Sequence, residues 1–391
     1  MKNYKEKLYL VLIAFMTLAL FFFNSLLPKE FDGSFNSVSG KVMEITFDNS
    51  DEIEDKSENA YKFQEFRLKI LEGRHKGEEY NMRNSLETFD VYNIRLEEGE
   101  KILVSLDEDE EGNITNLHVY DKKRDTKLFV LIGIFVLGVL LVGGKQGAKA
   151  ILTLSFTVLI IIKILLPLIL RGFSPVPTAV CILILIICVT LTVISGFTKK
   201  TLSAILGTSC GVVVAGVLSI ISGNLAQVTG LANDNAQQIV YLLNFPDLDF
   251  KGILFASIII GAMGAVMDVS MSIASSMNEL VNVHPEISKK ELIKSGMTIG
   301  RDIMGSMSNT LILAYTGSSC ELMLLFMVAG TSLKEIFNLD LIAGEIIRAS
   351  CGSIGLTVTI PFTVFICTLI YKKKSLDQSD AMSLENPKEN K

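Results

Sequence analysis

Residues 261–276 read GAMGAVMDVSMSIASS and residues 300–309 read GRDIMGSMSN, and both stretches belong to apolar parts of the chain. Charged side chains at membrane depth are costly, and they usually face a protein interior or a water-filled cavity. The carboxylate of Asp268 and the neighbouring pair Arg301 and Asp302 therefore mark a place where a polar group is handled. The two stretches predict a helical membrane protein with a polar centre.

The composition indicates the same class of protein. The chain has 391 residues, of which 49% are hydrophobic, and its mean hydropathy is +0.44. Residues 30–125 hold 25 acidic and 13 basic residues, whereas the rest of the chain holds 17 acidic and 23 basic residues. We therefore expect an acidic domain outside the lipid and a basic membrane part. No dense face of Lys and Arg is visible, so we expect no nucleic-acid partner.

Most apolar runs outside residues 30–125 approach the roughly 20 residues that cross a bilayer. They predict membrane segments at 8–27, 128–142, 150–170, 176–194, 202–222, 253–277, 298–316, 321–337 and 345–371. We expect an uncleaved membrane anchor at 1–29, a multi-helix domain at 126–371 and a polar tail at 372–391. The lysines at 2, 5 and 7 place the amino end in the cytoplasm by the positive-inside rule.

Residues 30–125 predict a small all-β domain on the outer side of the membrane. Apolar and polar residues alternate in five short stretches, at 40–47, 63–71, 77–84, 99–106 and 114–120. Five short strands with glycine-rich turns are typical of an OB-like barrel. Such barrels often bind oligomers, but this one is acidic and shows no evident aromatic stacking platform. We expect a structural domain or a docking surface for a protein partner.

The carboxyl-terminal half leaves two topologies open. Eight spans would place Lys372–Lys374 in the cytoplasm, which the positive-inside rule favours, and nine would place them outside. Residues 298–316 are the most polar segment, and irregular backbone is tolerated at membrane depth where it lines a cavity. We expect a broken or re-entrant helix there, preceded by a short basic surface helix capped by Ser288 and Glu291. A continuous helix with an inward polar face is the alternative.

Six residues are candidates for a polar binding site inside the membrane. Asp268 and Ser272 share one helix face, which suits a proton or cation site; a structural hydrogen bond is the alternative. Arg301 can neutralise Asp268 or bind an anion, or it can snorkel to the interface. We expect Asp268 to be buried and partnered by Arg301 or by serine hydroxyls. The candidate solute-binding residues are Asp268, Ser272, Arg301, Asp302, Asn309 and Arg348.

Other patterns predict packing rather than chemistry. Small residues recur every fourth position at Gly207, Gly211, Ala215, Ser219 and Gly223, which allows two helix backbones to approach closely. Glu345 and Arg348 are spaced for a local ion pair one helical turn apart. The six cysteines lie in or beside apolar segments without a Cys-x-x-Cys motif, so we expect no disulfide framework, no metal and no cofactor.

Four stretches resemble the YibE/F family of bacterial membrane proteins. They read LEGRHKGEEYNMRNSL at 71–86, GAMGAVMDVSMSIASSMNEL at 261–280, SGMTIGRDIMGSMSNTLILAYTGSS at 295–319 and EIIRASCGSIGLTVTIPFT at 345–363. The resemblance spans most of the chain and implies a multi-pass protein of the bacterial plasma membrane. It implies no activity for any residue.

The leading hypothesis is a secondary transporter or permease that moves a small solute or coupling ion through this polar centre. A broken helix beside a carboxylate is a common way to build a transporter site. The alternative is a non-transporting membrane scaffold or sensor whose β domain docks a protein partner. An enzyme is not expected, because no nucleophile–base or metal arrangement is visible in the sequence.

Overall fold

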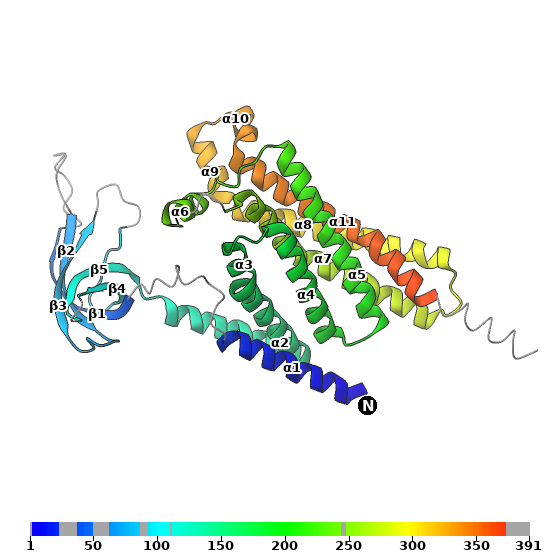
Figure 1. The fold of residues 1–391 in the computed structure, drawn as a ribbon, viewed down its shortest axis with the longest axis horizontal. Coiled ribbons are helices and arrows are strands. Elements are labelled where there is room, and N and C mark those ends of the chain that lie inside the picture. The colour runs from blue at the N-terminus through cyan, green and yellow to red at the C-terminus, as the bar shows by residue number, and fades with distance from the viewer. Residues whose placement is uncertain are drawn as a thin grey trace, which may run out of the picture. The chain divides into compact units, whose positions relative to one another are not determined.

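The computed structural model describes residues 2–22, 37–49, 62–86, 93–109, 112–243 and 248–372. The chain forms two compact units, one of residues Lys29–Val142 and one of residues Met1–Pro28 with Gly143–Lys391 (Figure 1). The last residues of the predicted anchor and nearly all of the predicted tail lie outside the described residues.

The first unit contains a five-stranded antiparallel sheet, as the alternating sequence predicts. The strand order is β3-β2-β1-β4-β5, so β1 lies in the middle. The register of β1 against β2 shifts twice, at bulges that increase the local twist and make the sheet barrel-like. The strands are β1 (Ser37–Asp48), β2 (Lys62–Ile70), β3 (Glu79–Leu86), β4 (Lys101–Glu108) and β5 (Ile114–Lys122).

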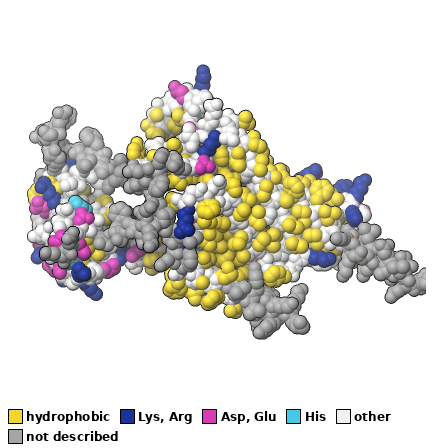
Figure 2. Space-filling view, viewed as in Figure 1, with side chains coloured by type: hydrophobic (Ala, Val, Ile, Leu, Met, Phe, Trp, Pro, Cys, Tyr) yellow, Lys and Arg dark blue, Asp and Glu magenta, His cyan; other side chains and the backbone are white. Residues whose placement is uncertain are grey.

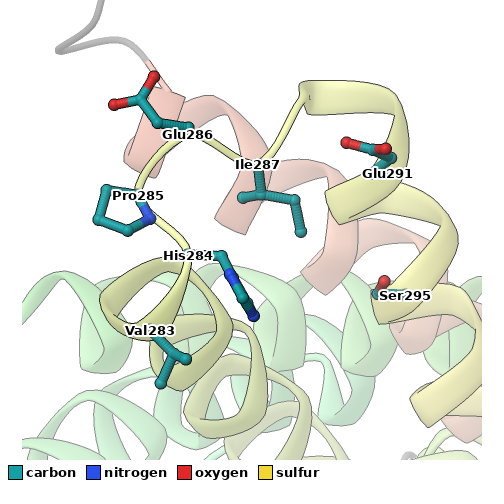
Figure 3. A pocket seen from close by; sticks show the side chains of 7 residues that line it. All are labelled: Val283, His284, Pro285, Glu286, Ile287, Glu291 and Ser295. Carbon is teal, nitrogen blue, oxygen red and sulfur yellow. The ribbon is translucent and has the colours of Figure 1, made fainter.

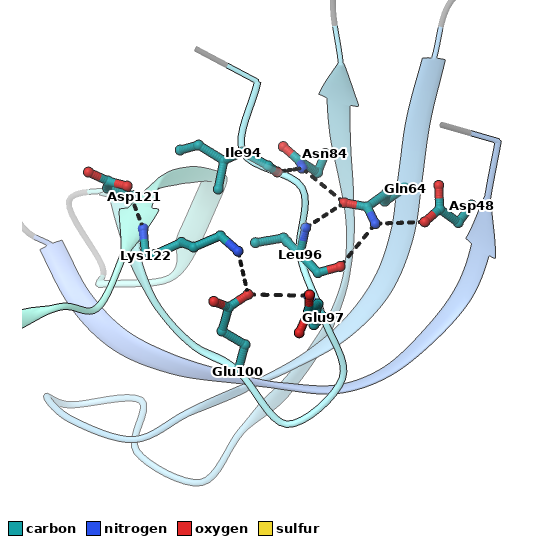
Figure 4. A network of polar contacts seen from close by, with 9 residues as sticks. All are labelled: Asp48, Gln64, Asn84, Ile94, Leu96, Glu97, Glu100, Asp121 and Lys122. Atoms are coloured by element: carbon teal, nitrogen blue, oxygen red, sulfur yellow. Dashed lines mark hydrogen bonds and ion pairs between the residues drawn. The ribbon is translucent and has the colours of Figure 1, made fainter. Parts of the chain in front are cut away.

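Inside the sheet, apolar side chains of alternate positions form the core around Phe66 and Leu68. A polar network lies among them (Figure 4). The Gln64 side chain is fully buried; its Nε2 donates to the Leu96 carbonyl at 3.1 Å, and its Oε1 accepts from the Leu96 amide at 2.9 Å. Asn84 Nδ2 donates to the Ile94 carbonyl at 2.7 Å. The network fastens residues 93–97 to β2 and β3.

The sheet also carries an aromatic pair that the sequence analysis did not identify. The rings of Phe47 and Phe63 stack with centroids 5.1 Å apart, and the Arg83 guanidinium lies 3.5 Å from the Phe63 centroid. Phe63 is half-buried and Arg83 covers its ring, so Phe47 is the exposed ring of this pair. The expectation that the domain offers no evident stacking platform for an oligomer stays a prediction.

Helices make up the rest of the described chain. Their bounds are α1 (Lys2–Phe22), α2 (Asp125–Ile160), the π-helical turn η2 (Ile161–Leu165), α3 (Leu166–Leu170), α4 (Pro175–Ser195), α5 (Lys199–Leu225), α6 (Asp234–Leu243), α7 (Phe250–Val283), α8 (Lys289–Ser318), α9 (Cys320–Ala329), α10 (Leu333–Asn338) and α11 (Asp340–Lys372). Five helical stretches are long and apolar enough to cross a membrane, or six if the bent pair α8 and α9 is one span. Figure 2 shows hydrophobic side chains over much of the visible helical surface. The chain is a membrane protein.

Helices α5, α7 and α11 pack against one another and form the centre of the helical unit. All five small residues of the predicted α5 stripe are buried, which confirms the prediction of tight packing. A Cβ on Gly207 would collide with the Thr363 side chain of α11, and one on Gly223 would collide with the Phe255 ring of α7. Ser270 and Thr363 join α7 to α11 through a hydroxyl–hydroxyl hydrogen bond of 3.0 Å.

The directions of the helices follow from these contacts. Ala262 lies beside Gly352 and Ser270 beside Thr363, so α7 and α11 run in the same direction. Gly296 lies beside Met277 and Gly300 beside Ile273, so α8 runs in the opposite direction to α7. Residues 319–339, which join α8 to α11, therefore begin and end at the same end of the bundle.

This arrangement corrects the expectation for residues 298–316. They belong to one continuous helix, α8, and the break comes after Ser318, where α9 turns away by 56°. The expected short basic surface helix is the first part of α8, although its capping box at Ser288 and Glu291 is confirmed. Polar residues do not break α8 because they lie on its outer face, while Gly296 and Gly300 pack inward.

The predicted segments 128–142 and 150–170 lie in one helical stretch of 46 residues. The backbone of Gly144 is not helical there, with φ 50° and ψ −125°. A positive φ suits glycine, because a side chain would be strained in that conformation. The division between the two compact units also falls next to this residue.

Candidate functional site

One face of α7 is polar, rich in small residues and exposed. Gly261, Gly264, Asp268 and Ser272 are all exposed, and their spacing of three or four residues places them along one stripe. The opposite face is buried and apolar, with Val266 and Ile273 among its residues. The apolar face holds α7 in the bundle, so the stripe around Asp268 must point outward.

Helix α8 presents a similar face. The Ser288 side chain accepts a hydrogen bond from the Glu291 amide at 3.2 Å and so fixes the start of the helix. From there the exposed positions are polar or glycine for about six turns, until Ile312 and Leu313. They are Lys289, Lys290, Glu291, Lys294, Thr298, Arg301, Asp302, Gly305, Ser306, Asn309 and Thr310.

The two polar faces lie at the same depth of the bundle. Ile273 of α7 lies beside Gly300 of α8, and the helices are antiparallel, so Asp268 is level with Gly305. Gly305 stands one turn from Arg301 and one turn from Asn309. The structure thus brings five of the six candidates within about two helical turns of one another on the surfaces of two packed helices. We call Asp268, Ser272, Arg301, Asp302 and Asn309 the polar belt.

The expected partner of Asp268 is not found. Asp268 is exposed rather than buried, and among the described residues it forms no hydrogen bond and no ion pair. The same holds for Arg301 and Asp302 within the described part of the chain. The expectation of a buried, partnered Asp268 is therefore wrong. The reason is geometric: both side chains lie on outward faces, and sequence spacing on single helices does not show which faces meet.

Such a surface cannot rest in lipid at low cost. One charged side chain at the centre of a bilayer costs about 2.5–3.5 kcal/mol on insertion scales. The polar belt holds three charged groups of both signs, beside hydroxyl and amide groups that donate and accept hydrogen bonds. Chemically, the belt can bind a cation through its carboxylates or an anion through Arg301.

Arg348, the sixth candidate, belongs to a separate cluster. Its guanidinium lies 3.5 Å from Glu345, which confirms the predicted ion pair. Gly352 of α11 lies beside Ala262 of α7, so Arg348, one turn earlier, is level with residue 258. That level is about 15 Å from Asp268 along the helix axis. Arg348 therefore does not belong to the polar belt.

Tyr315 is a polar residue near Arg348 that the sequence analysis overlooked. Its hydroxyl oxygen and Arg348 Nε are both buried without a hydrogen-bond partner among the described residues. Gly352 makes room for it, because a Cβ there would stand 3.3 Å from the Tyr315 hydroxyl. A tyrosine near the end of an apolar run resembles an interfacial anchor, so its position in the sequence does not single it out as a site residue.

A surface cavity of about 580 Å³ lies at the turn between α7 and α8 (Figure 3). His284, Ile287 and Ser295 line it, while the Glu286 side chain points away from it in this view. The cavity lies where α7 ends and α8 begins, and no residue of the polar belt lines it. It is a wide surface hollow rather than an enclosed binding site.

A second cavity, of about 660 Å³, lies in the sheet unit between residues 93–95 and 120–124. Its cations already have partners: Lys122 pairs with Glu100 at 2.9 Å and Arg124 with Asp121 at 2.6 Å. In the described part of the chain, no three His, Cys, Asp or Glu residues are grouped so that they could hold a metal ion.

Comparison with protein families gives two matches. The profile of the YibE/F-like protein family matches residues 131–373, and that of the YibE/F family N-terminal domain matches residues 35–121. Together they cover both the helical part and the sheet. Searches of curated proteins and of solved structures find no match.

Proposed function

The chain belongs to the YibE/F family, and from its polar belt we propose a secondary transporter or permease of the bacterial plasma membrane. The solute is small and polar or ionic. One observation carries the proposal: charged and hydrogen-bonding side chains lie within about two helical turns of one another on the surfaces of α7 and α8. Helix α7 is long and apolar enough to cross a membrane, and α8 meets that condition together with α9. Groups of this kind at membrane depth usually mark a solute or ion pathway.

The proposed topology supports this reading. The lysine-rich start lies in the cytoplasm and the sheet unit outside. The basic turn between α7 and α8 then lies inside, and α8 crosses to the outer side. Residues 319–339 stay on that side, and α11 returns, so that Lys372–Lys374 lie inside. The polypeptide therefore crosses the membrane eight times, and α9 and α10 stay on the outer side without crossing.

A membrane scaffold or sensor is the second candidate function. The sheet unit is a compact body with its own core and an exposed Phe47 ring stacked on the half-buried Phe63, which suits a docking surface. A scaffold explains this unit better than a transporter does. It leaves three charged groups at membrane depth without a role, so transport is the better-supported proposal.

Flux measurements on the purified full-length protein in liposomes test the proposal. Solid-supported-membrane recordings would compare inorganic cations, inorganic anions, amino acids and organic acids. Asp268→Asn keeps the shape of the side chain and removes its charge, and we expect at least a tenfold loss of flux, as for a group that contacts the solute. Lys334→Gln, on the exposed helix α10, is the matched control and should transport normally.

Two results would contradict transport. One is a solute current that Asp268→Asn and Arg301→Gln leave unchanged, because the path would then lie elsewhere. The other is a pair of findings. No solute of the panel gives a current, and the phenotype of cells that lack this protein is restored by the Asp268→Leu variant but not by a variant without the sheet unit. That pair of results would favour the scaffold.

A further inference from the structure

The polar belt has no cover in the described part of one chain. Gly264 of α7 and Gly305 of α8 stand beside it, and a Cβ on either would meet no atom within 4 Å. Lipid is a poor cover, because it satisfies neither the charges nor the hydrogen-bonding groups. A protein surface with matching charges is the cover that this face requires.

We propose that a second copy of this chain packs against the exposed faces of α7 and α8, so that the two copies share the polar belt. The inference rests on the proposed function for the meaning of the belt, and it adds that the solute path lies between two copies.

The charge pattern fits a two-fold arrangement. The exposed face of α7 is acidic, with Asp268 and Glu279. That of α8 is basic, because the cations Lys289, Lys290, Lys294 and Arg301 outnumber the anions Glu291 and Asp302. In a two-fold dimer the same patch of both copies forms the interface, so α7 of one copy can face α8 of the other. Both faces then meet opposite charge. Glu291 and Asp302 moderate the positive charge of α8 but do not reverse it.

The depths of these charges also match. Met277 lies beside Gly296, so Glu279 of α7 is level with Lys294 of α8. A two-fold axis parallel to the helices keeps each residue at its own depth, so these two groups meet across the interface. Asp268 and Arg301 differ by about one turn, roughly 6 Å, which an extended arginine side chain spans.

The size of the face is sufficient for association. The stretch from Gly261 to Glu279 is about 28 Å long, and two helices side by side are about 20 Å wide. Each copy would therefore bury roughly 550 Å², or about 1,100 Å² in total, which lies in the range of small specific interfaces. Gly264 and Gly305 let the helices approach closely at the centre of the face.

Charge reversal tests the pairing directly. Full-length protein in lipid nanodiscs would be weighed by native mass spectrometry, where the wild type should have twice the 42.9 kDa of one chain. Asp268→Arg and Arg301→Asp should each weaken dimerisation at least tenfold. The double variant restores the opposite charges and should recover the dimer. A double variant that stays monomeric, beside a dimeric wild type, would overturn the assigned pairing.

A cross-link tests the surface without changing a charge. In a background free of the six native cysteines, one copy carries Gly264→Cys and a second copy with a different tag carries Gly305→Cys. The two copies are expressed together. Oxidation of the membranes should give a covalent product of two chains that carries both tags. The matched control, Val213→Cys on the exposed face of α5, should give none. Monomers alone, or a product with a different protein, would overturn the proposal.

The outcomes separate this inference from transport. Cross-linked, charge-dependent dimers that move no solute would refute the transport proposal and leave the dimer standing. Solute flux from a protein that remains monomeric in nanodiscs would refute the dimer and leave transport standing.

Discussion

Thr359 of α11 occupies the space that Gly211 of α5 leaves free. A Cβ on Gly211 would collide with the Thr359 hydroxyl and stand 3.0 Å from the Gly355 carbonyl oxygen. The hydroxyl itself donates to that carbonyl at 2.9 Å, and Thr359 is fully buried. The backbones of the two central helices therefore approach each other at a point where no side chain fits.

Gly211→Ala should consequently destabilise the helical unit. Overpacking a close helix contact costs about 1–3 kcal/mol of the free energy of unfolding. Gly138→Ala is the matched control, because a Cβ there meets no atom within 4 Å, and alanine favours a helix by up to about 1 kcal/mol. Thermal unfolding of both variants in detergent, followed by size-exclusion chromatography, measures the difference. Equal stability of the two would contradict the close contact.

Gln64→Leu should loosen the sheet unit. The change keeps the approximate size of the side chain but leaves the amide and carbonyl of Leu96 without their partners. Two unsatisfied buried groups cost about 2–4 kcal/mol. Hydrogen exchange of β2 and of residues 93–97 in the full-length protein should speed up markedly. Glu65→Gln, which changes an exposed neighbour on the same strand, is the control and should leave the hydrogen exchange of these residues unchanged. Similar hydrogen exchange in Gln64→Leu and Glu65→Gln would disprove the role of the network.

The sheet unit should lose stability in acid. Lys123 donates to Glu72 at 3.0 Å and lowers the pKa of that carboxyl below its ordinary 4.5. Arg124 lowers the pKa of Asp121 below 3.8 in the same way. A carboxyl with a lowered pKa in the folded state stabilises the fold above its ordinary pKa, and this contribution is lost as the pH falls through the folded pKa.

Proteolysis of the full-length protein at about pH 6 and about pH 3.5 measures this loss. We expect faster cleavage within the strands at the lower pH. The effect is modest, since the two carboxylates, Glu72 and Asp121, remain partly exposed to water. Lys123→Gln should reduce the difference between the two pH values, and Lys76→Gln, an exposed residue of the β2–β3 turn, should not. An unchanged pH dependence in Lys123→Gln would exclude this ion pair as its source.

In the proposed topology α8 crosses the membrane, and the carboxyl-terminal tail should still lie in the cytoplasm. The reason is that α11 runs parallel to α7, and α7 ends at the basic turn before α8. A green fluorescent reporter fused after Lys374 should therefore fluoresce. The same reporter fused after Ser318, at the end of α8, should be dark. A dark full-length fusion would refute the helix directions or the proposed topology.

The sequence predicted the elements better than their contacts. Alternation with a period of two located all five strands, because each buries one face. Helical spacing placed Asp268 and Ser272 on one face of α7, as found. It did not show where that face points, because this depends on which side of α7 the apolar residues bury. The glycines of α8 were read as a break, but Gly300 packs against Ile360 of α11 and the helix continues.

The central claim is that the polar belt lines a path for a solute, and water access measures this most directly. Ser272→Cys and Asn309→Cys, each in a cysteine-free background, would be treated with a membrane-impermeant thiol reagent added to one side of sealed vesicles at a time. Leu185→Cys, on the exposed apolar face of α4, is the control and should stay unlabelled. The account predicts that both belt positions react from the outer and from the inner side. Belt cysteines that react from neither side, yet label fully after denaturation, would contradict it.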